Sequence, residues 1–320
     1  MTTLITGGLG FIGLHTARAL LDAGQDVVLT QHSVRREPDF LADEWGKRAH
    51  IEQLDVADAD AWAAIGRKHK IDGIVHLAAP SYGPQGPMHG LDAEMHTNML
   101  GLTNVLEAAR AWGVKRLSLA SSIVVYAGIA EGPFREDMPL RPIGTNTTET
   151  FKKMFEVVGS YYGQQAKLDI VMLRIANIYG PVHHSVFHQV TRLVIAAMKG
   201  ETRDPDRDVH DDDPADYCYV KDCADAITRL QLADSLPNRV YNIGAGRQTT
   251  NREVVDAIKR AVPESQLELE PGRGQGRGVG WRDNVYMDLS RIKADVGYEP
   301  RWPLDRAIPD YVEWLKTHES

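Results

Sequence analysis

A glycine-rich segment at the start of the chain, TGGLGFIG (6–13), has the spacing of a turn that binds the phosphates of a dinucleotide. Its glycines recur at Gly7, Gly10 and Gly13, between an apolar run and a helical pattern. A backbone without side chains lets a pyrophosphate approach closely, and the N-terminus of a helix attracts its charge. We therefore predict a dinucleotide site here, with Phe11 and Ile12 as part of it.

The residues after the second apolar run bear on which dinucleotide is bound. An acidic side chain at this point usually binds the ribose hydroxyls of the adenosine. This chain instead continues QHSVRR from Gln31, so the acid is missing and Arg35 and Arg36 are close by. Because a guanidinium pairs bidentately with a phosphate, the sequence favours NADP over NAD. If both arginines are only solvated loop residues, this preference no longer holds.

The elements that must position the turn follow from apolar runs that alternate with helical patterns. Strands are predicted at 4–6, 26–30, 50–55, 73–78, 116–121 and 169–175, with a helix over 12–23 after the first. Continuous apolar runs are typical of parallel strands that helices cover on both faces. The order strand, helix, strand therefore predicts an α/β fold with a doubly wound parallel sheet of the Rossmann type.

The sequence pattern changes after YGP (179–181), where a helix, an acidic loop, a strand at 239–244 and a Gly/Arg-rich loop follow. We expect residues 1–180 to form the dinucleotide-binding domain, joined by part of 216–250. Residues 181–320 are expected to form a smaller, partly interleaved α/β lobe that binds the substrate.

Composition excludes several classes of protein. A chain of 320 residues with 43% hydrophobic content can bury a sizeable core. It has no run of 18 apolar residues and no secretion signal, so we expect a cytoplasmic protein without a membrane partner. The net charge of −8 argues against nucleic-acid binding. Cys218 and Cys223 are not spaced as CxxC, and are expected to be free, buried thiols.

A series of motifs resembles the extended short-chain dehydrogenase/reductase family, which contains NAD(P)-dependent epimerases and dehydratases. The motifs are TGGLGFIG at 6–13, HLAA at 76–79, NMLGLTNVLEAAR at 98–110, ASSIVVYAG at 120–128, LRIANIYGP at 173–181, DYCYVKDCADAI at 216–227, YNIGAG at 241–246 and DLSRIKADVGYEP at 288–300. The resemblance runs nearly end to end. It implies hydride transfer between a nicotinamide and a hydroxyl or keto carbon of a sugar-like or other polar small molecule.

The resemblance also assigns further residues to the cofactor. Asp55 and Val56 match positions that contact the adenine, and Ala78 and Ala79 match positions that line the cofactor channel. Asn98 matches a position near the nicotinamide, and Ile175 completes the expected set. Related proteins commonly dimerise through two long helices, here at roughly 99–112 and 148–165. The second helix carries an apolar stripe that is consistent with a buried face: Phe151, Phe155 and Val158.

The catalytic residues that the resemblance implies are incomplete. Ser122 matches the catalytic serine, and Lys152 matches the lysine that holds the nicotinamide ribose and lowers the pKa of a tyrosine. That tyrosine lies four residues before the lysine, one helical turn away, and here the position holds Thr148. An aliphatic hydroxyl is several units more basic than a phenol of pKa about 10. Thr148 is therefore expected to relay a proton, to bind a substrate oxygen, or simply to belong to the first turn of a helix that Asn146 and Glu149 cap.

Four other side chains are candidates for the missing acid. Tyr82 follows the fourth strand, and His183 and His184 follow YGP, in segments that face the substrate in related folds. Glu149 acting through water is a further candidate. Each of these residues also has a simpler interpretation, as a residue that packs or lines a pocket.

The predicted substrate site also departs from the family. Its expected residues are Ser81, Tyr82, Ser122, Asn177, His183, His184 and Arg282. Family members that act on nucleotide sugars usually carry an arginine just before the aspartate that Asp216 matches, but this chain has Ala215. The carboxylates at 211–213 would in addition repel a diphosphate, which argues against a nucleotide sugar. We expect no metal, because His210 among loop carboxylates is typical of a solvated turn.

Two functions therefore remain open. The first is an NAD(P)-dependent oxidoreductase or epimerase with an unconventional proton donor. The second is a cofactor-binding or redox-sensing protein with impaired catalysis. The presence of both Ser122 and Lys152 favours the enzyme, because a binding module needs the lysine but has less use for the serine.

Overall fold

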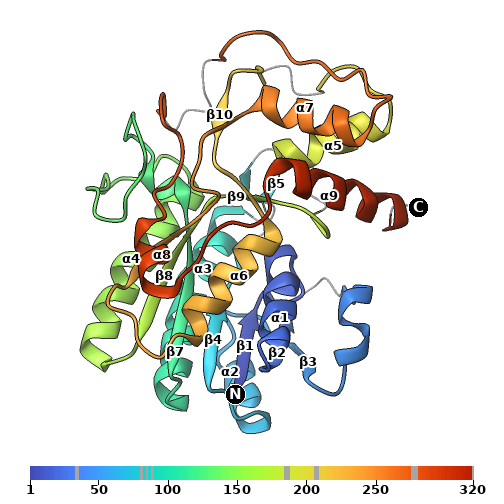
Figure 1. Ribbon diagram of the computed structural model, residues 1–320. Coiled ribbons are helices and arrows are strands. Elements are labelled where there is room, and N and C mark those ends of the chain that lie inside the picture. The colour runs from blue at the N-terminus through green and yellow to red at the C-terminus, as the bar shows by residue number, and fades with distance from the viewer. Residues whose placement is uncertain are drawn as a thin grey trace. The chain divides into compact units, whose positions relative to one another are not determined.

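The chain forms two compact units, here described from a computed structural model (Figure 1). The structure describes residues 1–32, 36–79, 82–83, 86–87, 90–183, 188–204, 209–274 and 280–318, with the backbone alone for 82–83 and 86–87. The first unit comprises Met1–Ser122, Thr145–Arg174 and Ala224–Tyr241, and the second comprises Ile123–Gly144, Ile175–Cys223 and Asn242–Ser320. The expected division into a dinucleotide-binding domain of 1–180 and a substrate-binding lobe of 181–320 stays a prediction.

A seven-stranded sheet forms the centre of the first unit, in the order β12-β8-β7-β4-β1-β2-β3. Its strands are β1 (Thr2–Thr6), β2 (Asp26–Gln31), β3 (Ala49–Gln53), β4 (Gly73–His76), β7 (Arg116–Ser122), β8 (Ile170–Ile175) and β12 (Val240–Ile243). The pairs of β1 with β2 and β4, β2 with β3, and β4 with β7 are parallel. The strand order reverses between β1 and β4, which is where ligands bind in open α/β sheets. The predicted Rossmann-type α/β fold is confirmed.

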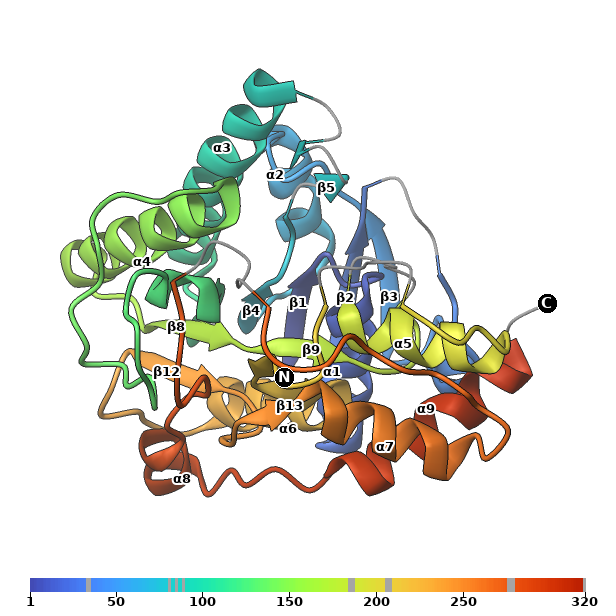
Figure 2. The same cartoon turned by 90° about the horizontal axis from the view of Figure 1, so that it is seen from above.

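Helices cover both faces of this sheet (Figure 2). One face carries α2 (Ala59–Lys68), α3 (Gly90–Trp112) and α4 (Thr147–Ala166), and the other carries α1 (Phe11–Asp22) and α6 (Val220–Leu232). The core beneath α2, α3 and α4 includes Leu4, Ile74, Leu117, Val105 and Phe155. These apolar residues come from several strands and helices, as expected when strands are buried on both faces.

The apolar stripe of α4 is only partly buried within a single chain. Phe151 and Phe155 are buried, but Val158 is 39% exposed. At 3.6 residues per turn, the buried face is centred nearer to Lys152 and Glu156 than to Phe151. The reason is that buried polar partners, described below, draw this side of the helix towards the sheet.

The second unit contains shorter elements. They are β9 (Asn177–Tyr179), α5 (Gln189–Met198), β10 (Pro214–Ala215), β11 (Tyr217–Tyr219), β13 (Thr249–Thr250), α7 (Asn251–Ala261), α8 (Ser290–Val296) and α9 (Leu304–His318). A capping box starts α7, because the Thr250 hydroxyl accepts from the Glu253 N–H and the Glu253 carboxylate accepts from the Thr250 N–H. Buried residues of α5, α7 and α9 form the core, among them Val194, Ile258 and Tyr311.

Remaining elements are short. The 3-10 helices are η1 (Asp39–Glu44) and η2 (Ile123–Tyr126), and β5 (Tyr82–Gly83) pairs with β6 (Gly86–Pro87) in antiparallel fashion. Cys218 and Cys223 are both buried and free, in agreement with the prediction. None of the helices in the described part of the chain has the length and hydropathy that a membrane span requires.

Candidate active site

The glycines of the turn after β1 lie where a Cβ atom would meet backbone atoms. Gly7 has a φ of +63°, a conformation that favours glycine, and its carbonyl accepts from the Gly10 N–H at 2.9 Å. A Cβ at Gly13 would lie 2.5 Å from the Gly7 oxygen and 2.7 Å from the oxygen of Gly8. The first turn of α1 can therefore pack directly against the backbone that leaves β1.

The N-terminus of α1 suits an anion. The helix begins at Phe11 with Gly10 as its N-cap, and its first turn contains no acidic residue. No side chain in the described part of the chain caps it. The amides of Phe11 and Ile12 thus lie at a helix end that favours negative charge. These features fit the pyrophosphate of a dinucleotide.

Side chains at the ends of β2 and β3 belong to the expected adenosine end of the site. Arg36 Nη1 is 3.5 Å from the Leu9 oxygen, which places this guanidinium beside the glycine turn, while Arg35 lies outside the described residues. Asp55 is exposed and accepts from the Ala57 N–H at 2.9 Å. Val56 is buried.

The residues that follow β4 pack against the glycine turn. The Ala78 N–H donates to Thr6 Oγ1 at 3.3 Å, and a Cβ at Gly7 would lie only 3.0 Å from the Ala78 nitrogen. Ala79 is exposed directly after it. On α3, Asn98 is buried and donates through Nδ2 to the Glu94 oxygen of its own helix at 2.9 Å. Because Ala78 and Ala79 carry only methyl groups, little side-chain volume fills the space beside the turn at this edge of the sheet.

A buried polar network ties α4 to the neighbouring strands. Ser121 donates to Glu156 Oε1 at 2.5 Å, and Arg174 of β8 donates to both Glu156 oxygens at 2.9 and 2.7 Å. Ser122 is half-buried at the end of β7, directly after Ser121. Because Glu156 lies one turn after Lys152, this network fixes the rotation of α4 on the sheet beside Ser122.

Thr148 lies half-buried in the first turn of α4. The Asn146 carboxamide caps the helix by accepting from the Glu149 N–H at 2.9 Å, as the spacing predicted. Thr145 donates to Glu149 through its N–H and its hydroxyl, each at 2.8 Å. The capping interpretation of this segment is therefore correct, and Thr148 itself is not the N-cap.

The Glu149 carboxylate is also paired with Lys153, whose Nζ lies 2.6 Å from Oε1 in a buried i,i+4 ion pair. Burial opposes ionisation of Glu149, but hydrogen bonds from Lys153 and Thr145 hold its pKa below the usual value. These contacts occupy both oxygens, which does not favour a proton relay through Glu149.

Lys152 has different surroundings from those of Lys153. It is half-buried, its Nζ lies 4.9 Å from the ring centroid of Phe155, and burial lowers its pKa to about 8. His76 of β4 is buried nearby and shares a 2.8 Å hydrogen bond with Thr6 through Nδ1. Burial and the positive charge of Lys152 lower the pKa of His76 to about 3, so this imidazole is neutral.

The expected substrate residues of the second unit have structural contacts. Asn177 Nδ2 lies 3.2 Å from the Asp216 oxygen, and His183 Nδ1 lies 2.8 Å from Thr191 Oγ1. Arg282 is exposed, and Ile175 is buried at the end of β8. Ser81 and His184 lie outside the described residues, as does the side chain of Tyr82.

The acidic loop before Asp216 is bonded internally. Asp211 accepts from the Gly272 N–H at 2.8 Å and pairs with Arg252 at 2.6 Å, and Asp213 accepts from the Gly274 N–H at 2.9 Å. Arg252 also pairs with Asp212 at 3.1 Å. The expected repulsion of a diphosphate is offset in part, because Arg252 pairs with two of the three carboxylates, while Asp213, among the residues that the structure describes, accepts only from backbone N–H groups.

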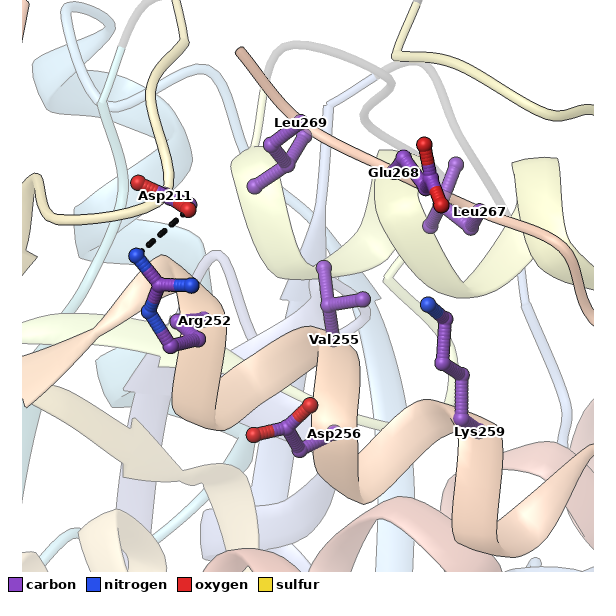
Figure 3. Close-up of a pocket in the computed structure, with 8 residues that line it drawn as sticks. All are labelled: Asp211, Arg252, Val255, Asp256, Lys259, Leu267, Glu268 and Leu269. Carbon is purple, nitrogen blue, oxygen red and sulfur yellow. Dashed lines mark ion pairs between the residues drawn. The ribbon is translucent and has the colours of Figure 1, made fainter. Parts of the chain in front are cut away.

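A shallow pocket of about 230 Å³ lies beside this loop (Figure 3). It is lined by Asp211, Arg252, Val255, Asp256, Lys259, Leu267, Glu268 and Leu269. None of the predicted site residues lines it. The described residues contain no group of three or more His, Cys, Asp or Glu that could hold a metal ion.

Three structurally important residues were not predicted as site residues from the sequence. They are His76, Glu156 and Asp216. Asp216 is fully buried and accepts from the N–H groups of Ala245 at 2.7 Å and Met287 at 3.1 Å. Burial raises its pKa to about 6 in spite of these hydrogen bonds. His76 and Asp216 stand within recognised motifs, HLAA and DYCYVKDC, and these were the available signals.

The class of protein follows from the first unit. A doubly wound parallel sheet with a glycine-rich turn at the N-terminus of α1, next to the point where the strand order reverses, defines a dinucleotide-binding enzyme fold. A serine at the end of β7 and a lysine on the buried face of α4 add groups that hydride chemistry uses.

Comparison with known proteins identifies the family. The model of the NAD dependent epimerase/dehydratase family matches residues 3–244, and the chain belongs to this family. A UDP-glucose 4-epimerase of Lacticaseibacillus casei is 28% identical over 99% of this chain and 98% of its own. A dTDP-glucose 4,6-dehydratase of Streptomyces griseus is 29% identical over 100% of this chain and 96% of its own.

A solved structure agrees with this assignment. The Thermus thermophilus UDP-glucose 4-epimerase in complex with NAD has a TM-score of 0.79 at 26% identity, and the match covers 99% of this chain and 100% of that chain. The prediction of an NAD(P)-dependent enzyme of the extended short-chain dehydrogenase/reductase type is confirmed.

Proposed function

We propose that the protein interconverts a hydroxyl and a keto group on the sugar of a nucleotide-linked substrate, as an epimerase or oxidoreductase. The observation that carries this proposal is the position of Ser122 and Lys152 in the same unit as the glycine turn, at the end of β7 and on the buried face of α4. The names of the relatives support a nucleotide-linked sugar. The pairing of Arg252 with Asp211 and Asp212 weakens the argument from charge against one.

Each residue has a defined task in this proposal. A bound nicotinamide cofactor would supply the hydride acceptor or donor. The turn from Gly7 to Gly13 and the N-terminus of α1 hold the pyrophosphate, and Ser122 donates a hydrogen bond to the substrate oxygen. Lys152 holds the ribose next to the nicotinamide. Because the charge that develops on the substrate oxygen must be stabilised, fixed donors contribute more than flexible ones.

We also propose a preference for NADP. Arg36 lies beside the glycine turn, and β2 ends in Gln31 where an acid would select the free ribose. Substituting Arg36 by Asp would then weaken NADPH binding at least tenfold and leave NADH binding unchanged or stronger. Equal loss for both cofactors would show that Arg36 does not select between them.

A homodimer formed through α3 and α4 completes the proposal. These helices contact each other, and their outer faces expose large apolar side chains: Leu91, Met95, Met99, Val157, Val158 and Tyr161. Residues 91, 95 and 99 follow one stripe at helical spacing. Contiguous exposed apolar surface of this kind marks an interaction site in soluble proteins.

The direct test is a titration of the purified protein with NADPH and NADH, followed by a stopped assay against free and nucleotide-linked hydroxy and keto sugars. Turnover of a nucleotide-linked sugar that Ser122→Ala reduces by two to four orders of magnitude would support the proposal. Tight cofactor binding without turnover of any panel member would instead identify a cofactor-binding or redox-sensing protein.

A further inference from the structure

Two adjacent lysines of α4 have opposite surroundings. Lys153 is buried and forms an ion pair with Glu149 at 2.6 Å. Lys152 makes no hydrogen bond or ion pair with any residue that the structure describes, and its Nζ lies over the ring of Phe155. A half-buried cation without a counter-charge is costly unless a ligand or a reaction uses it.

The charged groups of the elements around Lys152 are already committed. On α4 itself, Glu149 pairs with Lys153, and Glu156 pairs with Arg174 of β8 and accepts from Ser121 of β7. No carboxylate of this network is left over to neutralise the Lys152 ammonium.

The described titratable groups of the neighbouring elements β4 and α3 form no ion pair with Lys152 either. On β4, His76 is buried and neutral and bonds to Thr6. On α3, which contacts α4, Glu107 accepts from Arg110 at 2.6 Å and from Tyr162. Glu94 of the same helix is buried, and among the described residues it forms no ion pair with Lys152. Lys152 therefore lies in surroundings that favour its neutral amine.

The position one turn before Lys152 has no phenol. Thr148 stands there, half-buried, and its aliphatic hydroxyl is too basic in its ionised form to exchange a proton near neutrality. The described residues of the first unit therefore place no tunable acid between Lys152 and a substrate hydroxyl.

We propose that Lys152 is itself the group that moves the proton in this enzyme. In the oxidising direction its neutral amine takes the hydroxyl proton of the substrate. The C–H bond breaks at the same carbon, its electron pair leaves as hydride to the oxidised nicotinamide, and the C–O bond becomes a carbonyl. In the reducing direction the ammonium returns the proton to the substrate oxygen. This inference rests on the function proposed above and replaces only the assignment of Lys152 to holding the ribose alone.

The protonation state of Lys152 supports this role. Its pKa of about 8 keeps both forms populated near neutral pH, which is the condition under which a general acid or base is most effective. A lysine buried in this way can act as a base, whereas an arginine keeps its charge at every accessible pH.

The first test requires no turnover. The unmodified protein is treated with an amine-acylating reagent over a range of pH, and the labelling of each lysine is followed by peptide mass spectrometry. We expect half-maximal labelling of Lys152 near pH 8, about two units below an ordinary lysine. A midpoint of Lys152 at about 10 or above would overturn the proposal.

The second test compares two conservative variants. Lys152→Arg keeps the positive charge but cannot release a proton, so we expect turnover to fall by 10² to 10⁴, with cofactor binding in fluorescence titration changed by less than about tenfold. Lys153→Arg is the matched control and should keep turnover within about threefold. In the wild type, kcat/KM for oxidation should rise with pH through the midpoint that labelling gives for Lys152.

The outcomes separate this inference from the proposed function. If Lys152→Arg retains turnover within tenfold, or loses cofactor affinity in proportion to turnover, Lys152 only holds the cofactor and the inference fails while the function holds. If the wild type turns over no member of the sugar panel, the proposed function itself fails. The labelling midpoint and the pH profile of kcat/KM are both measured on the wild type. A midpoint at about 10, or a kcat/KM for oxidation that does not rise through the labelling midpoint, therefore overturns the inference even if Lys152→Arg does not fold.

Discussion

The neutral histidine of β4 makes the stability of this protein depend on pH in a way that can be isolated. Folding lowers the pKa of His76 from 6.5 to about 3, through burial and through the charge of Lys152. Below pH 6.5 the unfolded chain therefore binds a proton that the folded chain does not. Stability is lost as the pH falls below 6.5, and this contribution reaches its limit only below about pH 3.

The magnitude follows from the two pKa values. At about pH 5 the proton taken up by the unfolded chain costs the folded state roughly 2 kcal/mol, and the full difference would be about 5 kcal/mol. Substituting His76 by Gln removes the titration, and the carboxamide can still form a hydrogen bond with Thr6. The variant will differ from the wild type in absolute stability, so only the change between the two pH values is compared.

The assay is urea unfolding followed by tryptophan fluorescence at about pH 7.5 and about pH 5. We expect the free energy of unfolding of the wild type to fall by roughly 2 kcal/mol more than that of His76→Gln between these conditions. His96→Gln, an exposed histidine of α3, is the control and should behave as the wild type. An equal fall in wild type and His76→Gln would refute the neutral, buried state of His76.

Three further predictions concern cofactor binding, stability and assembly. Gly13→Ala would bring a Cβ to 2.5 Å from a backbone oxygen, so cofactor affinity measured by NADPH fluorescence should fall at least tenfold; unchanged affinity would show that the turn adapts. Glu156→Gln removes the carboxylate charge that pairs with the buried Arg174 at 2.7 Å and should lower the free energy of unfolding by about 3 kcal/mol in urea titrations, and a loss below about 1 kcal/mol would contradict this ion pair. Tyr161→Asp places a charge on the exposed apolar face of α4 and should convert a dimer into a monomer in analytical ultracentrifugation, with unchanged far-UV circular dichroism; a persistent dimer would move the interface elsewhere.

Local sequence patterns were sufficient to predict many of the strands and helices. The strands at 26–30 and 116–121 were expected within one residue of β2 and β7, because a continuous apolar run allows few alternatives. The start of α4 was predicted from Asn146 and Glu149, whose side-chain chemistry satisfies the first amides of a helix. The exposure of Val158 within a single chain was not predicted, because helical periodicity gives the spacing of a stripe but not which side of the helix packs on the sheet.

The sequence by itself determined that a glycine-rich turn opens the chain and that Thr148 stands four residues before Lys152. Both are statements about residue type at fixed spacing, for which neighbours along the chain suffice. Only the tertiary structure decided that Lys153 is paired with Glu149, whereas Lys152 has no ion pair with any residue that the structure describes. The two lysines are adjacent and chemically identical, and the difference arises from which side of α4 meets Glu149, Phe155 and the neutral imidazole of β4. Burial and pairing depend on residues far apart in the chain, and these set the charge of a side chain.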